Sequence, residues 1–170
     1  MKVYLDTCIL SRLLDLRIKS DQLNSLDIIS SNEDVEFVTS PKTLQEFENT
    51  TNENRRKSLR ILFKIIKKIY APPPVYSYSG LFGGAPFGVA QFGGGSGKII
   101  NTPYDKLIKY FDKNDAAHIY FAIKSKCDYF LTLDNQTIID VVKKNSNKIK
   151  KIIEPMKIVN PAEMVRDLSK

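Results

Sequence analysis

The sequence predicts an α/β fold in which a parallel sheet lies between helices on both of its faces. Short apolar segments, suited to buried strands, occur at residues 2–5, 35–39, 129–133 and 156–159. They alternate with longer segments whose apolar residues recur at helical spacing, and this alternation is typical of parallel sheets. A length of 170 residues, 42% of them hydrophobic, suits one domain with a sizeable core. We therefore predict a single domain over residues 1–170.

Four helices are predicted between the first strand and residue 70. Two of them cover residues 7–16 and 20–31, the third begins at Ser40-Pro41, and the fourth covers about 54–70. Serine suits the N-cap and proline suits the first helical position. Thr50 and Glu53 have the spacing of a capping box before the fourth helix. The side chains expected to face the core are Leu23, Leu26, Ile29, Leu44, Phe47, Leu59, Leu62, Phe63, Ile66 and Ile69.

Basic residues cover the polar face of the predicted helix over 54–70. The net charge of +7 and a pI near 9.3 favour a polyanionic partner, such as nucleic acid or a membrane surface. A basic helix face can equally be a solvated surface, and the sequence leaves both interpretations open. The candidate RNA-binding residues on this helix are Arg55, Arg56, Arg60 and Lys64.

Residues 71–103 form a predicted Gly/Pro-rich loop insertion. All eight glycines fall between Gly80 and Gly97, and four of the eight prolines, Pro72, Pro73, Pro74 and Pro86, lie among them or shortly before them. Glycine at this density does not hold a regular helix or strand. A loop of this length is either functional or a flexible insertion, and its interleaved tyrosines and phenylalanines could stack on bases.

The remaining elements follow the insertion. Helices are predicted over 104–111, 114–126 and 137–144, a basic run crosses 143–151, and Asn160-Pro161 begins a closing helix. The side chains expected to face the core here are Tyr104, Leu107, Ile108, Phe111, Ala116, Ile119, Tyr120, Ile123 and Cys127.

The sequence indicates a cytoplasmic protein that does not bind membranes. No apolar stretch approaches the roughly 18 residues of a membrane span. Only three apolar residues separate Lys2 from Asp6, which is unlike a signal peptide. Cys8 and Cys127 lie in apolar segments without a CxxC pair, so we expect reduced, buried thiols.

Four carboxylates are placed to converge at one edge of the predicted sheet. Asp6 and Asp134 follow predicted strands, and Glu46 and Asp115 lie near the N-termini of predicted helices. Sites in open α/β sheets form outside the carboxyl ends of the parallel strands. Gathered carboxylates repel one another, and a divalent cation removes that repulsion. Oxygen ligands suit Mg²⁺ or Mn²⁺, and an acidic metal site in a basic protein suits cleavage of phosphodiesters.

Each of these residues also has a purely structural interpretation. Asp6 and Asp134 could cap the helices that follow them. Asp115 could be a first-turn acid stabilised by the helix dipole. Glu46 could be a solvated helix residue, and we expect His118 to be a hydrogen-bonded structural residue rather than a ligand or base. The joint pattern of the four acids favours a site.

The chain resembles the PIN-domain ribonucleases, and especially the VapC-like toxins of bacterial type II toxin–antitoxin pairs. The resemblance rests on VYLDTCIL, on SPKTLQEF with Glu46, on DAAHIYFAIKSKCDYFLTLD, and on IVNPAEMV, which together span most of the chain outside the Gly-rich segment. It implies a PIN-like (Rossmann-like) three-layer α/β/α fold with a central parallel sheet of four or five strands.

The resemblance also implies an activity and a set of site residues. The activity is Mg²⁺- or Mn²⁺-dependent hydrolysis of RNA, with metal held by Asp6, Asp115 and Asp134 and with Glu46 as the fourth acid. Thr7 and Thr132 match polar neighbours of the site, and His118 is expected to support it. A cognate antitoxin and a homodimer are implied as partners. The family often has Asn at the position of Cys8.

Two other classes of function compete with the ribonuclease. A non-catalytic module with the same fold would bind RNA or protein without metal-dependent cleavage. A receiver or phosphatase-type protein would use Asp6 as a phosphorylated nucleophile. The phosphatase signature DxDx[TV] is not met, because Cys8 stands where the second aspartate would be.

Overall fold

A computed structural model describes residues 1–68 and 102–169 of the chain. Within these ranges the core is a five-stranded, entirely parallel sheet in the order β3-β2-β1-β4-β5. The strands are β1 (Lys2–Leu5), β2 (Glu36–Thr39), β3 (Lys67–Lys68), β4 (Tyr129–Leu131) and β5 (Lys157–Val159). The predicted α/β fold with a parallel sheet of four or five strands is confirmed.

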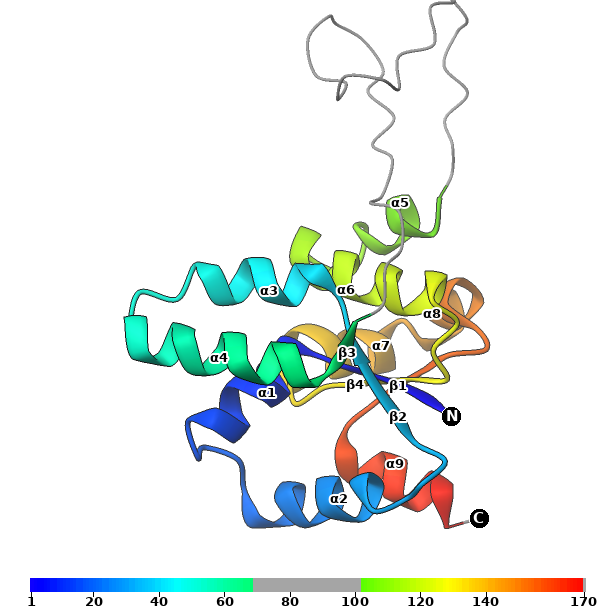
Figure 1. The fold of residues 1–170 in the computed structure, drawn as a ribbon. Coiled ribbons are helices and arrows are strands. Elements are labelled where there is room, and N and C mark those ends of the chain that lie inside the picture. The colour runs from blue at the N-terminus through cyan, green and yellow to red at the C-terminus, as the bar shows by residue number, and fades with distance from the viewer. Residues whose placement is uncertain (69–101, 170) are drawn as a thin grey trace, which may run out of the picture.

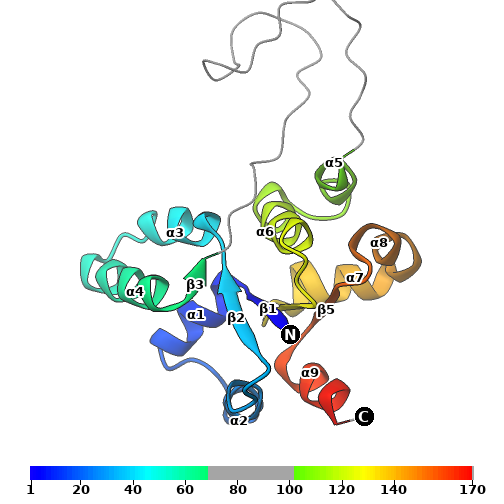
Figure 2. The same cartoon turned by 45° about the vertical axis from the view of Figure 1, so that its right-hand side comes forward.

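Helices cover both faces of the sheet. In both views α5 and α6 lie on one side of the strands, and α2 and α9 lie on the other (Figures 1 and 2). The helices are α1 (Thr7–Leu14), α2 (Ser20–Ser30), α3 (Pro41–Glu48), α4 (Glu53–Ile65), α5 (Pro103–Leu107), α6 (Lys113–Lys124), the π-helix η1 (Asn135–Ile139), α7 (Asp140–Lys144), α8 (Ser146–Ile153) and α9 (Pro161–Leu168).

The alternation of side chains along β1 divides the core into two clusters. Tyr4 packs into the cluster that contains α5 and α6, whereas Val3 and Leu5 pack into the cluster that contains α1, α2 and α9. Successive strand residues point to opposite faces, so a strand covered on both faces is apolar throughout. Burial of each such side chain contributes about 1.5–3 kcal/mol, which fixes β1 at the centre of the sheet.

The predicted helix over 54–70 is too long at its C-terminal end. The helix ends at Ile65, Ile66 has an extended ψ of 139°, and Lys67 pairs with Val38 of β2. The predicted capping box at Thr50 is also wrong, because the N-cap is Asn52, whose side chain accepts a hydrogen bond from the Arg55 amide at 2.9 Å. The segment therefore supplies the fifth strand of the sheet.

Smaller differences concern the other helices. The predicted helix over 104–111 ends at Leu107, and Ile108 is 42% exposed rather than inward. Leu23 is likewise 46% exposed. The predicted helix over 137–144 is the π-helical turn η1 followed by α7, and most of the basic run over 143–151 belongs to α8.

The predicted insertion over 71–103 lies outside the described residues except for its last two. Thr102 caps α5 and Pro103 is the first residue of that helix. Across the two described ranges, we find no helix with the length and apolar character needed to cross a bilayer.

Candidate active site

Adjacent strands bring Asp6 and Asp134 to the same edge of the sheet. β1 and β4 are parallel neighbours, with Leu5 paired to Leu131. Asp6 follows β1 directly, and its amide donates to the Leu131 carbonyl at 3.1 Å. Asp134 follows β4 by three residues. The order of the strands therefore places both carboxylates at the carboxyl edge, as the sequence predicted.

Asp6 is held from two sides by neighbouring polar groups. Its side chain is 6% exposed, and its Oδ2 accepts hydrogen bonds from Thr132 Oγ1 at 2.6 Å and from Cys8 Sγ at 3.0 Å. In the described part of the chain this carboxylate makes no capping bond to α1. The capping interpretation of Asp6 is therefore wrong, and its orientation comes from the site.

Cys8 acts here as a hydrogen-bonding side chain. Its sulfur also accepts from the Leu133 amide at 3.2 Å and lies 3.3 Å from Thr132 Oγ1. Burial, and then the charge of Asp6, raise the pKa of the Cys8 thiol. The thiol keeps its proton and can donate it to Asp6.

Thr137 links Asp134 to Asp115. The Asp134 carboxylate accepts from the Thr137 amide at 2.8 Å, so it caps η1 in the way that aspartates often do. The Thr137 hydroxyl donates to Asp115 Oδ2 at 3.0 Å. One residue of the π-helical turn therefore contacts the carboxylate that follows β4 and another from α6.

Asp115 has a raised pKa because it is partly buried near other carboxylates. Burial raises its pKa, the charges of Asp112, Asp6 and Asp134 raise it further, and the hydrogen bond from Thr137 lowers it, with a result of about 6. Asp112 is the N-cap of α6 and accepts from the Asp115 amide at 2.9 Å. Carboxylates from two strands and one helix thus repel one another at the same edge.

Glu46 lies on α3, and its partners differ from those of the three aspartates. It is half-buried, and its Oε1 lies 2.9 Å from His118 Nε2. Burial raises the pKa of Glu46, but the hydrogen bonds from His118 and Thr7 and the charges of His118 and Lys42 lower it more, so the net shift is downward. It is therefore no freely solvated residue, and the groups that shift its pKa are not the three aspartates.

The predicted RNA-binding residues lie on α4, where all four interact with other groups of the protein. Arg55 forms a two-pronged ion pair with Asp15, with both N···O distances 2.9 Å. Arg60 forms a similar pair with Glu48. Arg56 Nη1 donates to the Thr50 carbonyl at 2.9 Å, and Lys64 is exposed on the same helix. These ion pairs partly neutralise the basic face.

The donor atoms of the site suit a hard cation, but the side chains do not form a ready-made cage. The oxygens of Asp6, Asp115 and Asp134 are the ligand type that Mg²⁺ and Mn²⁺ prefer. Over residues 1–68 and 102–169, no three His, Cys, Asp or Glu side chains lie close enough to hold a metal together.

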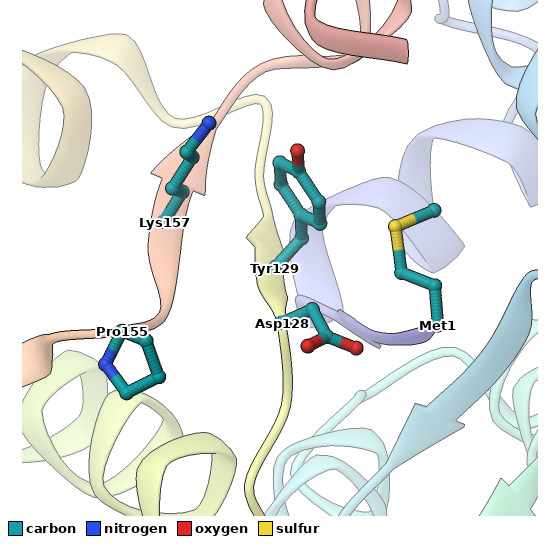
Figure 3. Close-up of a pocket in the computed structure, with 5 residues that line it drawn as sticks. All are labelled: Met1, Asp128, Tyr129, Pro155 and Lys157. Atoms are coloured by element: carbon teal, nitrogen blue, oxygen red, sulfur yellow. The ribbon is translucent and has the colours of Figure 1, made fainter.

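A shallow pocket of about 400 Å³ lies elsewhere, at the opposite edge of the sheet (Figure 3). It is lined by Met1, Asp128, Tyr129, Pro155 and Lys157. Met1 precedes β1, Asp128 precedes β4, and Lys157 begins β5, so these residues surround the amino ends of the strands. None of the four predicted acids lines it.

Three residues that bond to the site aspartates were not among the predicted site residues. Asp112 could have been found, because an aspartate three residues before Asp115 has N-cap spacing. Cys8 departs from the family pattern, and that departure does not predict its hydrogen bond to Asp6. Thr137 had no signal in the sequence, since its contact with Asp115 depends on the π-helical turn.

Fold and site together define an α/β domain with a parallel sheet and three aspartates at its carboxyl edge. No family model matches the sequence, and no curated protein matches it either. Among solved structures, a chain in the crystal structure of VapBC2 from Rickettsia felis, bound to a DNA fragment from their promoter, is similar to this one, with a TM-score of 0.50 and 14% sequence identity. The match covers 94% of this chain and 98% of that chain. At 14% identity, the similarity is evidence for a shared fold alone.

Proposed function

We propose that this protein is a Mg²⁺- or Mn²⁺-dependent endoribonuclease and the toxin of a toxin–antitoxin pair. The observation that carries the proposal is the placement of Asp6, Asp115 and Asp134 at one edge of the sheet, where burial and their mutual repulsion help to raise the pKa of Asp115 to about 6. Carboxylates that repel one another in a cleft are common where a protein binds a cation or catalyses a reaction. The similarity to a VapBC2 chain supports the same proposal.

The protein's own residues have distinct roles in this proposal. Asp6, Asp115 and Asp134 would hold the metal together with Glu46 as the fourth acid, while Thr132 and Cys8 fix the orientation of Asp6. The bound metal supplies activation of water and stabilisation of the leaving oxygen. Hydrolysis of this class would leave a 5′-phosphate and a 3′-hydroxyl end.

The proposed partners follow from the charge and the resemblance. RNA would be bound through its phosphates by basic residues, including those of α4 that remain exposed. A small antitoxin would bind near the acidic edge, and the toxin would be a cytoplasmic homodimer.

The test is an RNA cleavage assay with purified protein. Wild type should cleave RNA with Mg²⁺ or Mn²⁺ and lose the activity in EDTA. Asp6→Asn and Asp115→Asn should abolish cleavage while their circular dichroism spectra stay unchanged. Asp21→Asn, which makes the same change at an exposed position of α2, is the matched control and should keep full activity. Full activity in either site variant would defeat the assignment.

The second candidate is a non-catalytic PIN-like module that binds RNA or protein. It is favoured by one observation, namely that no three potential ligands are gathered around a metal position in the described ranges. It predicts the same RNA affinity with and without EDTA and no cleavage under either condition.

A further inference from the structure

A buried chain of polar side chains leads from the interior of the protein to Glu46. Tyr4 Oη lies 2.7 Å from Ser40 Oγ and 2.7 Å from His118 Nδ1, and His118 Nε2 lies 2.9 Å from Glu46 Oε1. Tyr4 and Ser40 are fully buried and His118 is 2% exposed. The three links join β1, α6 and α3. Ser40 is the N-cap of α3, and Glu46 lies within that helix.

The hydrogen bonds of this chain run in one direction when the His118 ring is neutral. A Glu46 carboxylate can only accept a hydrogen bond, so His118 Nε2 carries the proton between them. In the neutral ring Nδ1 is then an acceptor. The Tyr4 hydroxyl has one proton and donates it to Nδ1 across 2.7 Å. The phenol oxygen then accepts from Ser40.

The Ser40 hydroxyl bonds to Tyr4 instead of capping α3. Serine at an N-cap ordinarily accepts from an amide of the first helical turn. Ser40 makes no such side-chain bond to the described helix α3, and its hydroxyl contacts Tyr4 instead.

The Tyr4 hydroxyl is not required by packing. The Tyr4 ring stacks on Phe130 with centroids 5.2 Å apart and planes 7° from parallel. A phenylalanine would make this contact equally well and would bring no polar group into the core, where such a group costs free energy unless it is bonded. The hydroxyl therefore requires another explanation, and its contact with His118 offers one.

We infer that Tyr4 is a positioning residue of the site: its hydroxyl, supported by Ser40, holds His118 in the ring orientation and tautomer that donate to Glu46. Outer partners of this kind orient the groups that contact a metal, and their loss weakens metal binding. The inference rests on the proposed function only for the role assigned to Glu46. The relay from Ser40 to Glu46 is a property of the fold itself.

The experiment compares Tyr4→Phe with wild type by two measurements. His118 is the single histidine of the chain, so its two ring nitrogens can be assigned without ambiguity in ¹⁵N spectra. Wild type should show the tautomer protonated at Nε2, and Tyr4→Phe should show a mixture of tautomers. The Mn²⁺ dissociation constant should rise about tenfold in the variant, the lower end of what outer-partner changes cause.

Tyr104→Phe is the matched control. Tyr104 is 1% exposed and belongs to the same core cluster as Tyr4, but its hydroxyl contacts the Lys113 carbonyl at 3.5 Å rather than His118. It should leave both the ¹⁵N shifts and the Mn²⁺ affinity at their wild-type values. If Tyr4→Phe does not fold, Ser40→Ala removes the preceding donor and should give the same changes in weaker form.

The outcomes separate the relay from the nuclease. Wild-type ¹⁵N shifts in a folded Tyr4→Phe protein would overturn the relay. Altered shifts with unchanged Mn²⁺ affinity would overturn the positioning role. If wild type itself binds no Mn²⁺, the proposed function fails, and the ¹⁵N shifts of the variant still decide whether Tyr4 controls His118.

Discussion

Asp115 links the proposed chemistry to stability, and the sign of that link follows from its pKa. The folded value of about 6 lies above the usual value of roughly 3.9. Above pH 6 the carboxylate is charged in the folded and in the unfolded protein. It destabilises the folded protein, because there the charge is partly buried beside other carboxylates. Below about pH 4 it is protonated in both states and contributes nothing. We predict that Asp115→Asn raises the free energy of unfolding at pH 7 by about 1 kcal/mol, after allowance for solvent screening.

The measurement is urea unfolding of wild type and Asp115→Asn, without metal, across this pH range. The gain should shrink as the pH falls from 6 to 4. Addition of Mn²⁺ should stabilise wild type and leave the variant unchanged, since the variant lacks a ligand. A variant that is less stable than wild type at pH 7 would contradict the prediction.

Thr137 offers a test of how Asp115 is held. Thr137→Val removes the hydroxyl that donates to Asp115 but keeps the amide that donates to Asp134. Because that hydroxyl lowers the pKa of Asp115, the pKa should rise in the variant, as followed by NMR of the carboxyl carbon. The rate of RNA cleavage should fall about tenfold. Thr137→Ser keeps the hydroxyl and should retain the wild-type pKa of Asp115 and the wild-type cleavage rate. Equal effects of the valine and serine substitutions would show that the hydroxyl does not hold Asp115.

At the scale of residues, the sequence predicted the acids better than their partners. Asp6 and Asp134 could be placed because each follows an apolar strand, and the strand direction then determines the edge. Thr132 was predicted from the resemblance, and it does contact Asp6. Thr137 could not be predicted, because a π-helical turn and an ordinary helical turn place its hydroxyl differently.

At the scale of elements, α6 ends with a residue in an unfavourable conformation. Lys126 has a φ of 54°, and the Cys127 amide bonds to the Ala122 carbonyl, which is the usual pattern when glycine ends a helix. A side chain there costs about 1 kcal/mol. We predict that Lys126→Gly raises the free energy of unfolding by roughly 0.5–1 kcal/mol, as measured by urea denaturation.

The control for this prediction is an exposed lysine inside a helix. Lys148 lies within α8, and Lys148→Gly should lower the free energy of unfolding by about 1 kcal/mol. Opposite signs at the two positions are expected. Destabilisation by Lys126→Gly would show that its side chain makes contacts that outweigh the backbone strain.

The C-terminal boundary of α4 could not be predicted from the spacing of apolar residues. Apolar residues continue at helical spacing through Ile66 and Ile69, so the sequence favoured a helix to residue 70. The chain leaves the helix at Ile66 because pairing with β2 satisfies the backbone of Lys67 and Lys68. That pairing joins segments distant in sequence, and no local spacing encodes it.

At the scale of the whole molecule, the sheet brings distant parts of the chain together. Asp6 and Thr132 are 126 residues apart and share a hydrogen bond because β1 and β4 are neighbours. The alternation of strands and helices predicted parallel strands but carried no information on their order. The acidic edge could therefore be predicted as a cluster, whereas the separate connection of Glu46 to His118 could not.

The net charge of +7 leads to a prediction about RNA binding. Arg60 of α4 forms an ion pair with Glu48, and both side chains are exposed. If α4 contacts RNA phosphates, Glu48→Gln frees Arg60 for one more contact. The RNA affinity should rise, and the slope of log affinity against log salt should steepen by about 0.7. The affinity is measured by fluorescence anisotropy in an Asp6→Asn background, so that the RNA is not cleaved.

Glu33→Gln is the matched control, because it adds the same single positive charge at an exposed position that precedes β2, away from α4. A uniform effect of net charge would change both variants equally, since steering by the total field does not depend on one residue. A local contact would change the slope only in Glu48→Gln. Equal slopes in the two variants would remove α4 from the proposed RNA surface and leave its basic face as a solvated one.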